Sequence, residues 1–277
     1  MRQSSFSPAA LQRRIACALG QSGCDLVLRN ARIFNVFTKA FVDHCDVAIA
    51  DGIIVNVGPQ LAVHGKSEID LENAILVPGF IDAHVHIESS MLRPTEFARL
   101  ILSKGTTTIV ADPHEIANVC GLEGIRFMLQ DAKDAAVDIR FMLPSCVPAT
   151  PFETSGASLT ADELRTLIDN PDVMGLAEVM NVPAVLSGDS EMLEKLTMAH
   201  VANKHIDGHA PMLEGDGLSA YVAAGVSSDH ECSTAKEALE RIAKALQDKT
   251  LAPWHLSSHR KTVPCSACVR TTHRPTT

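Results

Sequence analysis

The first 74 residues contain one helical segment followed by several short β-like segments. Leu11, Ile15 and Ala18 recur at helical spacing, which predicts an N-terminal helix within residues 1–24. The pair Asp51-Gly52, flanked by apolar runs, is typical of a hairpin turn. We therefore expect residues 25–74 to form a small antiparallel, β-sandwich-like domain. Its predicted strands lie at 25–29, 31–35, 46–50 and 53–58.

Residues 75–248 have a different pattern, in which apolar runs alternate with amphipathic stretches. We predict strands at 75–86, 106–112, 139–145, 173–179, 205–208 and 225–228. We predict helices at 95–103, 121–135, 160–169, 189–203 and 234–246. Strands that alternate with helices at this interval form a parallel sheet, with the spacing of a (β/α)8 barrel. The predicted fold class is therefore α/β, an incomplete (β/α)8 TIM-like barrel of about six β/α units.

Residues 249–277 fit neither pattern. No acidic residue follows Asp248, whereas basic residues, Ser, Thr and Pro are frequent, and no helical or strand periodicity is visible. One interpretation is a disordered basic tail. We favour an irregular tail that is not part of the fold, as a shifted reading frame would produce, because the alternation stops where a barrel should continue.

Composition narrows the class of protein. The 277 residues are 46% apolar and 21% charged, a globular balance that suits one large domain with a small one appended. A net charge of −9 argues against a nucleic-acid partner, and no apolar run is long enough to span a bilayer. No secretory signal is visible, and eight irregularly spaced cysteines fit reduced thiols. We expect a cytoplasmic protein with no nucleic-acid or membrane partner.

Metal-binding side chains gather at the ends of the predicted strands. A barrel places the carboxyl ends of its strands on one face, so these side chains can converge although they are far apart in sequence. Imidazole and carboxylate together suit divalent Zn, Mn or Fe, and one carboxylate can bridge two ions that share a water molecule. In chain order the candidates are His84, His86, Asp112, His114, Glu115, Glu178, His209 and His230.

Five runs of sequence resemble a known family. The first, VPGFIDAHVH at 77–86, is similar to the opening of the metal-dependent amidohydrolase superfamily. Its extension to Met91 resembles the bacterial-type adenine deaminases, as do GTTTIVADPHEIAN at 105–118, GLAEVM at 175–180, DGHAP at 207–211 and SDHE at 228–231. The resemblance implies a (β/α)8 barrel with a small β domain, and hydrolysis of adenine to hypoxanthine and ammonia in purine salvage.

The resemblance also implies roles for the candidate residues. His84 and His86 would hold a first metal ion, Glu178 would bridge where many relatives use a modified lysine, and His209 and His230 would hold a second ion. The expected cofactor is two divalent ions, most often manganese, with iron or zinc as alternatives. A homo-oligomer like those of the family is compatible with the resemblance.

The remaining candidates are expected to be catalytic. Asp112, His114 and Glu115 would line the pocket, where they could bind the purine, relay protons or hold an extra metal.

One departure from the family shapes the expectation of activity. The superfamily uses an aspartate at the end of strand eight, and nothing after Asp248 supplies one. We therefore expect a truncated, frameshifted form with little or no activity of its own. Two other readings stay open: an amidohydrolase that acts on other cyclic amides or amidines, and a non-catalytic remnant of the family.

The evidence for a different class of deaminase is weaker. Zinc nucleobase deaminases carry His-x-Glu and Pro-Cys-x-x-Cys, and the chain contains HIE at 86–88 and PCSAC at 264–268. These two runs are much farther apart than that compact fold usually allows, and the second lies in the irregular tail.

Overall fold

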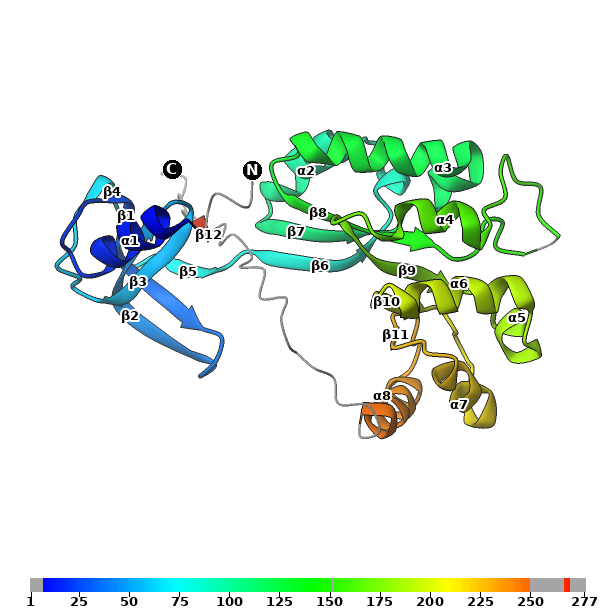
Figure 1. The fold of residues 1–277 in the computed structure, drawn as a ribbon. Helices are drawn as coiled ribbons and strands as arrows, with labels where there is room; N and C mark the ends of the chain where they lie inside the picture. The colour runs from blue at the N-terminus through cyan, green and yellow to red at the C-terminus, as the bar shows by residue number, and fades with distance from the viewer. Residues whose placement is uncertain (1–6, 151, 250–266, 270–277) are drawn as a thin grey trace, which may run out of the picture. The chain divides into compact units, whose positions relative to one another are not determined.

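The computed structural model describes residues 7–150, 152–249 and 267–269, which form two compact units. The first comprises the described residues up to Phe80 together with Ala267–Val269, and the second runs from Ile81 to Lys249. Figure 1 shows the helices and strands of both units. None of the helices in the described part of the chain combines the length and apolar character needed to cross a membrane.

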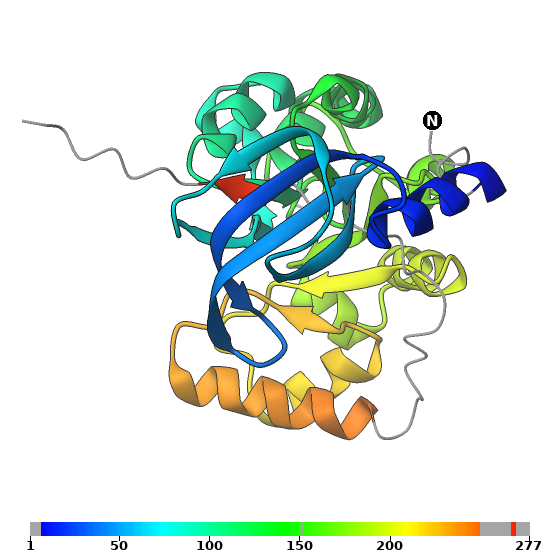
Figure 2. The same cartoon turned by 90° about the vertical axis from the view of Figure 1, so that its left-hand side faces the viewer.

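The first unit is a small β domain with one helix. Ser7 caps that helix by accepting a hydrogen bond from the Ala10 amide, and Pro8 occupies its first turn, where no amide donor is needed. The helix packs against β2 and β3 (Figure 2). The elements are α1 (Pro8–Ala18), β1 (Cys24–Asn35), β2 (Ala40–Ala50), β3 (Ile53–Pro59), β4 (Gly65–Asp70), β5 (Ile75–Pro78) and β12 (Ala267–Val269).

The sheet of this domain is mixed, whereas an antiparallel sheet was expected. β1 pairs antiparallel with β2, as β2 does with β3, but β4 and β5 run parallel to β1. The predicted hairpin is confirmed, and both turn residues have positive φ, 54° at Asp51 and 71° at Gly52. The two pieces predicted at 25–35 are one strand with irregular register near Asn30, whose φ is 54°. β12 pairs antiparallel with β5, and the rest of the tail beyond Lys249 lies outside the described residues.

The second unit contains a curved six-stranded sheet in the order β11-β10-β9-β8-β7-β6, and the register pairs from β7 to β11 are parallel. This is the expected incomplete barrel. Its strands are β6 (Phe80–Val85), β7 (Thr106–Ala111), β8 (Asp138–Pro144), β9 (Val173–Val179), β10 (His205–Gly208) and β11 (Ser228–Asp229). Its longer helices are α2 (Pro94–Leu102), α3 (His114–Asp131), α4 (Ala161–Ile168), α6 (Ser190–Val201), α7 (Gly215–Ala223) and α8 (Ala235–Lys249) (Figure 1).

Helices pack onto the sheet and bury an apolar core. α2 contacts β7, α3 contacts β8, and α6 contacts both β9 and β10. The core takes alternate or successive residues from the strands, including the wholly buried Phe141, Leu143 and Leu176. A capping box begins α4, with Thr160 and Glu163 bonded reciprocally.

Several boundaries differ from the prediction. The run at 75–86 is divided at Gly79 into β5 and β6, which belong to different sheets. α3 begins at His114, seven residues before the predicted start, and kinks at Gly121, where φ is 58°. β11 begins only at Ser228. The short helix α5 (Val182–Ser187) and helix α7 were not predicted.

Candidate metal centre

The carboxyl ends of the strands bring five predicted ligands to one place. His84 lies in β6 and His86 follows it, Glu178 lies in β9, and His209 and His230 directly follow β10 and β11. Adjacent strands approach closely here. A Cβ at Gly208 would lie 2.6 Å from the Ser228 carbonyl oxygen, so this position requires glycine for β10 and β11 to pair as they do.

Glu178 is the centre of the cluster. Its side chain is 5% exposed, and its Oε1 lies 2.8 Å from His84 Nε2, 2.9 Å from His86 Nε2 and 3.6 Å from His230 Nε2. Its Oε2 lies 3.4 Å from His209 Nδ1. One carboxylate therefore contacts all four histidines, which is the position predicted for a bridging ligand.

The donor atoms are packed as they would be around a cation. His84 Nε2 and His86 Nε2 are 3.1 Å apart, and the His84 and His230 rings stack with centroids 3.7 Å apart. The buried Nδ1 of His209 has no hydrogen-bond partner among the described residues, although it lies within ion-pair distance of Glu178. Converging imidazole nitrogens and carboxylate oxygens, with one nitrogen left unsatisfied, fit a divalent metal, which takes both kinds of atom as ligands.

These contacts determine how Glu178 and His86 are charged when no metal is bound. Burial alone would raise the pKa of Glu178, but hydrogen bonds from His84 and His86 hold it well below its usual range. Hydrogen bonds to Glu115 and Glu178 raise the pKa of His86 to about 11, against the effect of burial. The His86 imidazole thus carries a proton that a metal ion would have to displace.

The three residues predicted to be catalytic lie beside this cluster. Glu115 Oε2 lies 3.1 Å from His86 Nδ1, and His114 Nδ1 lies 2.5 Å from Asp112 Oδ1. The side chains of Asp112 and His114 are 1% and 7% exposed, and Asp112 Oδ2 and His114 Nε2 have no hydrogen-bond partner among the described residues. Burial raises the pKa of Asp112. Despite its own burial, the pKa of His114 is raised by the Asp112 carboxylate.

Two residues at the site were not singled out from the sequence. Asp207 Oδ2 lies 2.8 Å from His230 Nδ1, and this hydrogen bond raises the pKa of His230. Glu231 has a carboxylate oxygen within 4.8 Å of ligand nitrogens of His209 and His230. Alternation was a usable signal for Asp207, because it lies two positions before His209 on an extended segment.

A cavity adjoins His209. It has a volume of about 450 Å³, and most of its lining is apolar, with Thr150 and His209 as polar exceptions. Its apolar lining comprises Ala149, Met180, Val182, Ala210, Pro211, Met212 and Leu213. A cavity of this kind beside convergent polar groups is the usual form of a small-molecule site.

Comparison with known proteins identifies the family. The amidohydrolase family model matches residues 75–260, which is more than half of the chain. The chain belongs to the amidohydrolase family.

The expected resemblance to bacterial adenine deaminases is confirmed as well. This amidohydrolase is 52% identical over 232 residues to the adenine deaminase of Clostridium acetobutylicum, covering 84% of this chain and 40% of that protein. It is 48% identical over 238 residues to that of Geobacillus kaustophilus, covering 86% and 41%. The chain therefore spans about two fifths of the length of the curated relatives that it matches.

Solved structures agree on the fold. A D-aminoacylase variant in complex with copper chloride matches with a TM-score of 0.59 at 19% identity, covering 81% of this amidohydrolase chain and 56% of that chain. A zinc-containing N-acyl-D-glutamate deacylase from Bordetella bronchiseptica matches with a TM-score of 0.58 at 14% identity, covering 83% and 57%.

Proposed function

We propose that this chain provides the metal centre of an adenine deaminase, which hydrolyses adenine to hypoxanthine and ammonia. The observation that carries the proposal is Glu178 in contact with four histidines, in a chain about half identical to proteins named adenine deaminase. We assign two divalent ions, manganese in the first place, with iron or zinc as the alternatives.

The ligands divide into two sets. His84 and His86 would hold one ion and His209 and His230 the other, with Glu178 as the ligand common to both sets. When bound, such ions lower the pKa of a water molecule from 15.7 toward about 7, so that hydroxide is available near neutral pH. Asp207, hydrogen-bonded to His230 Nδ1, fixes the tautomer in which Nε2 is free to ligate.

The protons are moved by the chain's own side chains. Hydrolysis adds water oxygen at C6 of the purine and releases the amino group as ammonia, so a proton must pass from the water to the leaving nitrogen. We assign this transfer to the Asp112–His114 pair and to Glu115. Glu115 contacts His86, and a ring nitrogen of His114 lies within 4.8 Å of ligand atoms of His86 and Glu178. The cavity beside His209 receives the apolar faces of the purine ring.

The setting of the reaction is part of the same proposal. We place it in purine salvage in the cytoplasm, with adenine as the partner and assembly into a family-like homo-oligomer. The six cysteines whose side chains the structure describes are unpaired, which suits a reducing compartment.

Purified chain reconstituted with Mn²⁺ and given adenine tests the proposal. We expect ammonia and hypoxanthine in equal amounts, at the low rate predicted from the sequence, and loss of both in His84→Ala. The control is His64→Ala, whose side chain is 90% exposed in the small β domain. Turnover of hydantoin or dihydrouracil in place of adenine would favour another amidohydrolase activity. Metal binding without turnover of any of these would favour a non-catalytic relative.

A further inference from the structure

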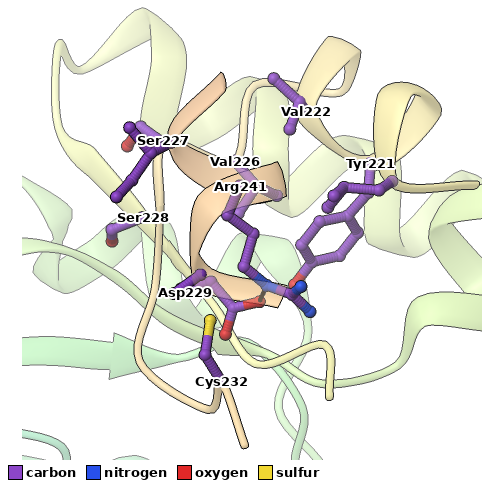
Figure 3. Close-up of a pocket in the computed structure, with 11 residues that line it drawn as sticks. Tyr221, Val222, Val226, Ser227, Ser228, Asp229, Cys232 and Arg241 are labelled. Atoms are coloured by element: carbon purple, nitrogen blue, oxygen red, sulfur yellow. Dashed lines mark hydrogen bonds and ion pairs between the residues drawn. The ribbon is translucent and has the colours of Figure 1, made fainter. Parts of the chain in front are cut away.

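A buried arginine lies behind the histidines of the second set. Arg241 of α8 is 8% exposed, and its Nε lies 2.6 Å from Asp229 Oδ2 in an ion pair whose two side chains are 9% and 6% exposed. Its Nη2 donates to the Ala210 carbonyl oxygen, and its Nη1 lies 3.4 Å from the Glu237 carbonyl oxygen. Figure 3 shows the guanidinium turned toward Asp229, beside Tyr221.

A buried tyrosine makes similar contacts from the neighbouring helix. Tyr221 of α7 is 1% exposed. Its hydroxyl donates to the Val179 carbonyl oxygen and accepts a hydrogen bond from the His209 amide at 3.2 Å. One hydroxyl therefore ties the end of β9 to the residue that follows β10.

These contacts fall next to the candidate ligands. Asp229 precedes His230, Ala210 follows His209, and Val179 follows Glu178. The support is needed most at β11, which has only two residues, pairs with β10 and is the edge strand of the described sheet. Two residues of backbone pairing cannot by themselves fix the direction of the imidazole that follows them.

We propose that Arg241 and Tyr221 are positioning residues that hold His209 and His230 in place for the second metal ion. This inference rests on the proposed function, which makes those histidines ligands. The planar arginine fork reaches the carboxylate beside one histidine and the carbonyl beside the other at once, which a lysine ammonium on a flexible stem does not reproduce.

The variants follow from the shape of the site. A cavity of about 320 Å³ lies beside the guanidinium and already exposes apolar side chains, so truncation to alanine would enlarge it. Arg241→Met keeps most of the volume and removes the fork, Arg241→Lys keeps the charge, and Tyr221→Phe removes a single oxygen. Lys236→Met, on the same helix and 76% exposed, is the matched control.

The experiment is calorimetric titration of metal-free protein with Mn²⁺, with circular dichroism of each variant. We expect wild type and Lys236→Met to bind two ions. In Arg241→Met and in Tyr221→Phe, one of the two binding events should lose affinity 10- to 100-fold while the other is unchanged, the usual effect of removing a group behind a ligand. Arg241→Lys should recover part of the loss.

The outcomes separate the two proposals. A wild-type chain that binds no Mn²⁺ overturns the metal assignment and this inference with it. Wild type that binds two ions, with both affinities retained in folded Arg241→Met or in Tyr221→Phe, overturns the positioning role alone. An equal loss of affinity for both ions overturns the positioning role too, because that pattern indicates a general loss of structure in the barrel. If Arg241→Met does not fold, the Mn²⁺ titration of Tyr221→Phe alone decides whether the positioning role holds.

Discussion

Glu178→Gln is the substitution that most directly tests the centre. It keeps the shape of the side chain but removes the negative charge and turns one of its two acceptor oxygens into a donor. That side chain is 5% exposed and contacts four imidazoles, so the amide would have no solvent to compensate for the change. The four histidines would then lose the carboxylate anion that contacts each of their imidazoles.

The magnitude follows from the contacts. Two imidazole nitrogens, of His84 and His86, lie 2.8 and 2.9 Å from the same carboxylate oxygen. A metal ion replaces those hydrogen bonds, so the substitution removes one charged ligand from the ion. Sites with four protein ligands bind a divalent ion by about 10–16 kcal/mol. Taking about 3 kcal/mol for one ligand, the affinity for metal should fall about 150-fold.

Metal content measured by mass spectrometry after dialysis against a weak chelator is a suitable assay. Wild type should retain its ions and Glu178→Gln should lose them, with ammonia release from adenine falling in parallel. Glu123→Gln is the matched control, because Glu123 is 77% exposed on α3 and pairs with Arg126. Retention of wild-type metal content by Glu178→Gln would refute the bridging role and the reasoning behind it.

Two further predictions concern protonation and stability. The pKa of His86 is raised to about 11, so metal uptake below that pH displaces a proton, and the apparent Mn²⁺ affinity should rise up to about tenfold per pH unit between pH 7 and 10. Glu115→Gln removes the largest cause of that shift and should flatten the dependence at its upper end; an unchanged slope in calorimetric titrations would contradict this. Ser145→Ala removes a wholly buried hydroxyl that donates to the Glu178 carbonyl oxygen at 2.6 Å. The Met180 amide donates to the same oxygen, so urea denaturation should show a loss of about 1 kcal/mol in the free energy of unfolding, and a loss above about 3 kcal/mol would count against this account.

The strands of the barrel could be predicted because strands buried on both faces are continuous apolar runs. β9 and β10 have the boundaries that the sequence pattern predicted. α5 and α7 could not be predicted in this way. α5 has six residues and a proline in its first turn, and α7 begins with GDG, whose glycines oppose helix formation, so packing must decide both.

The cluster of histidines with Glu178 could be expected for a topological reason: parallel strands place their carboxyl ends together whatever the sequence between them. The residues that hold the backbone around that cluster could not be predicted in the same way. Arg241 and Tyr221 lie in helix interiors with no motif around them, and each bonds a backbone carbonyl, a partner that no sequence pattern marks. Asp207 is intermediate, because alternation relates it to His209.

The backbone at Glu178 shows why this support matters. Its φ of 29° lies in the left-handed region, which costs a residue other than glycine about 1–3 kcal/mol and persists only where neighbouring contacts enforce it. Two buried hydroxyls do so, since Ser145 bonds the carbonyl of Glu178 and Tyr221 bonds that of Val179. At about 0.5–1.5 kcal/mol each, the two bonds are of the same size as the strain. The unusual turn of the chain that directs Glu178 toward four histidines is thus held by side chains that bond to the backbone around it.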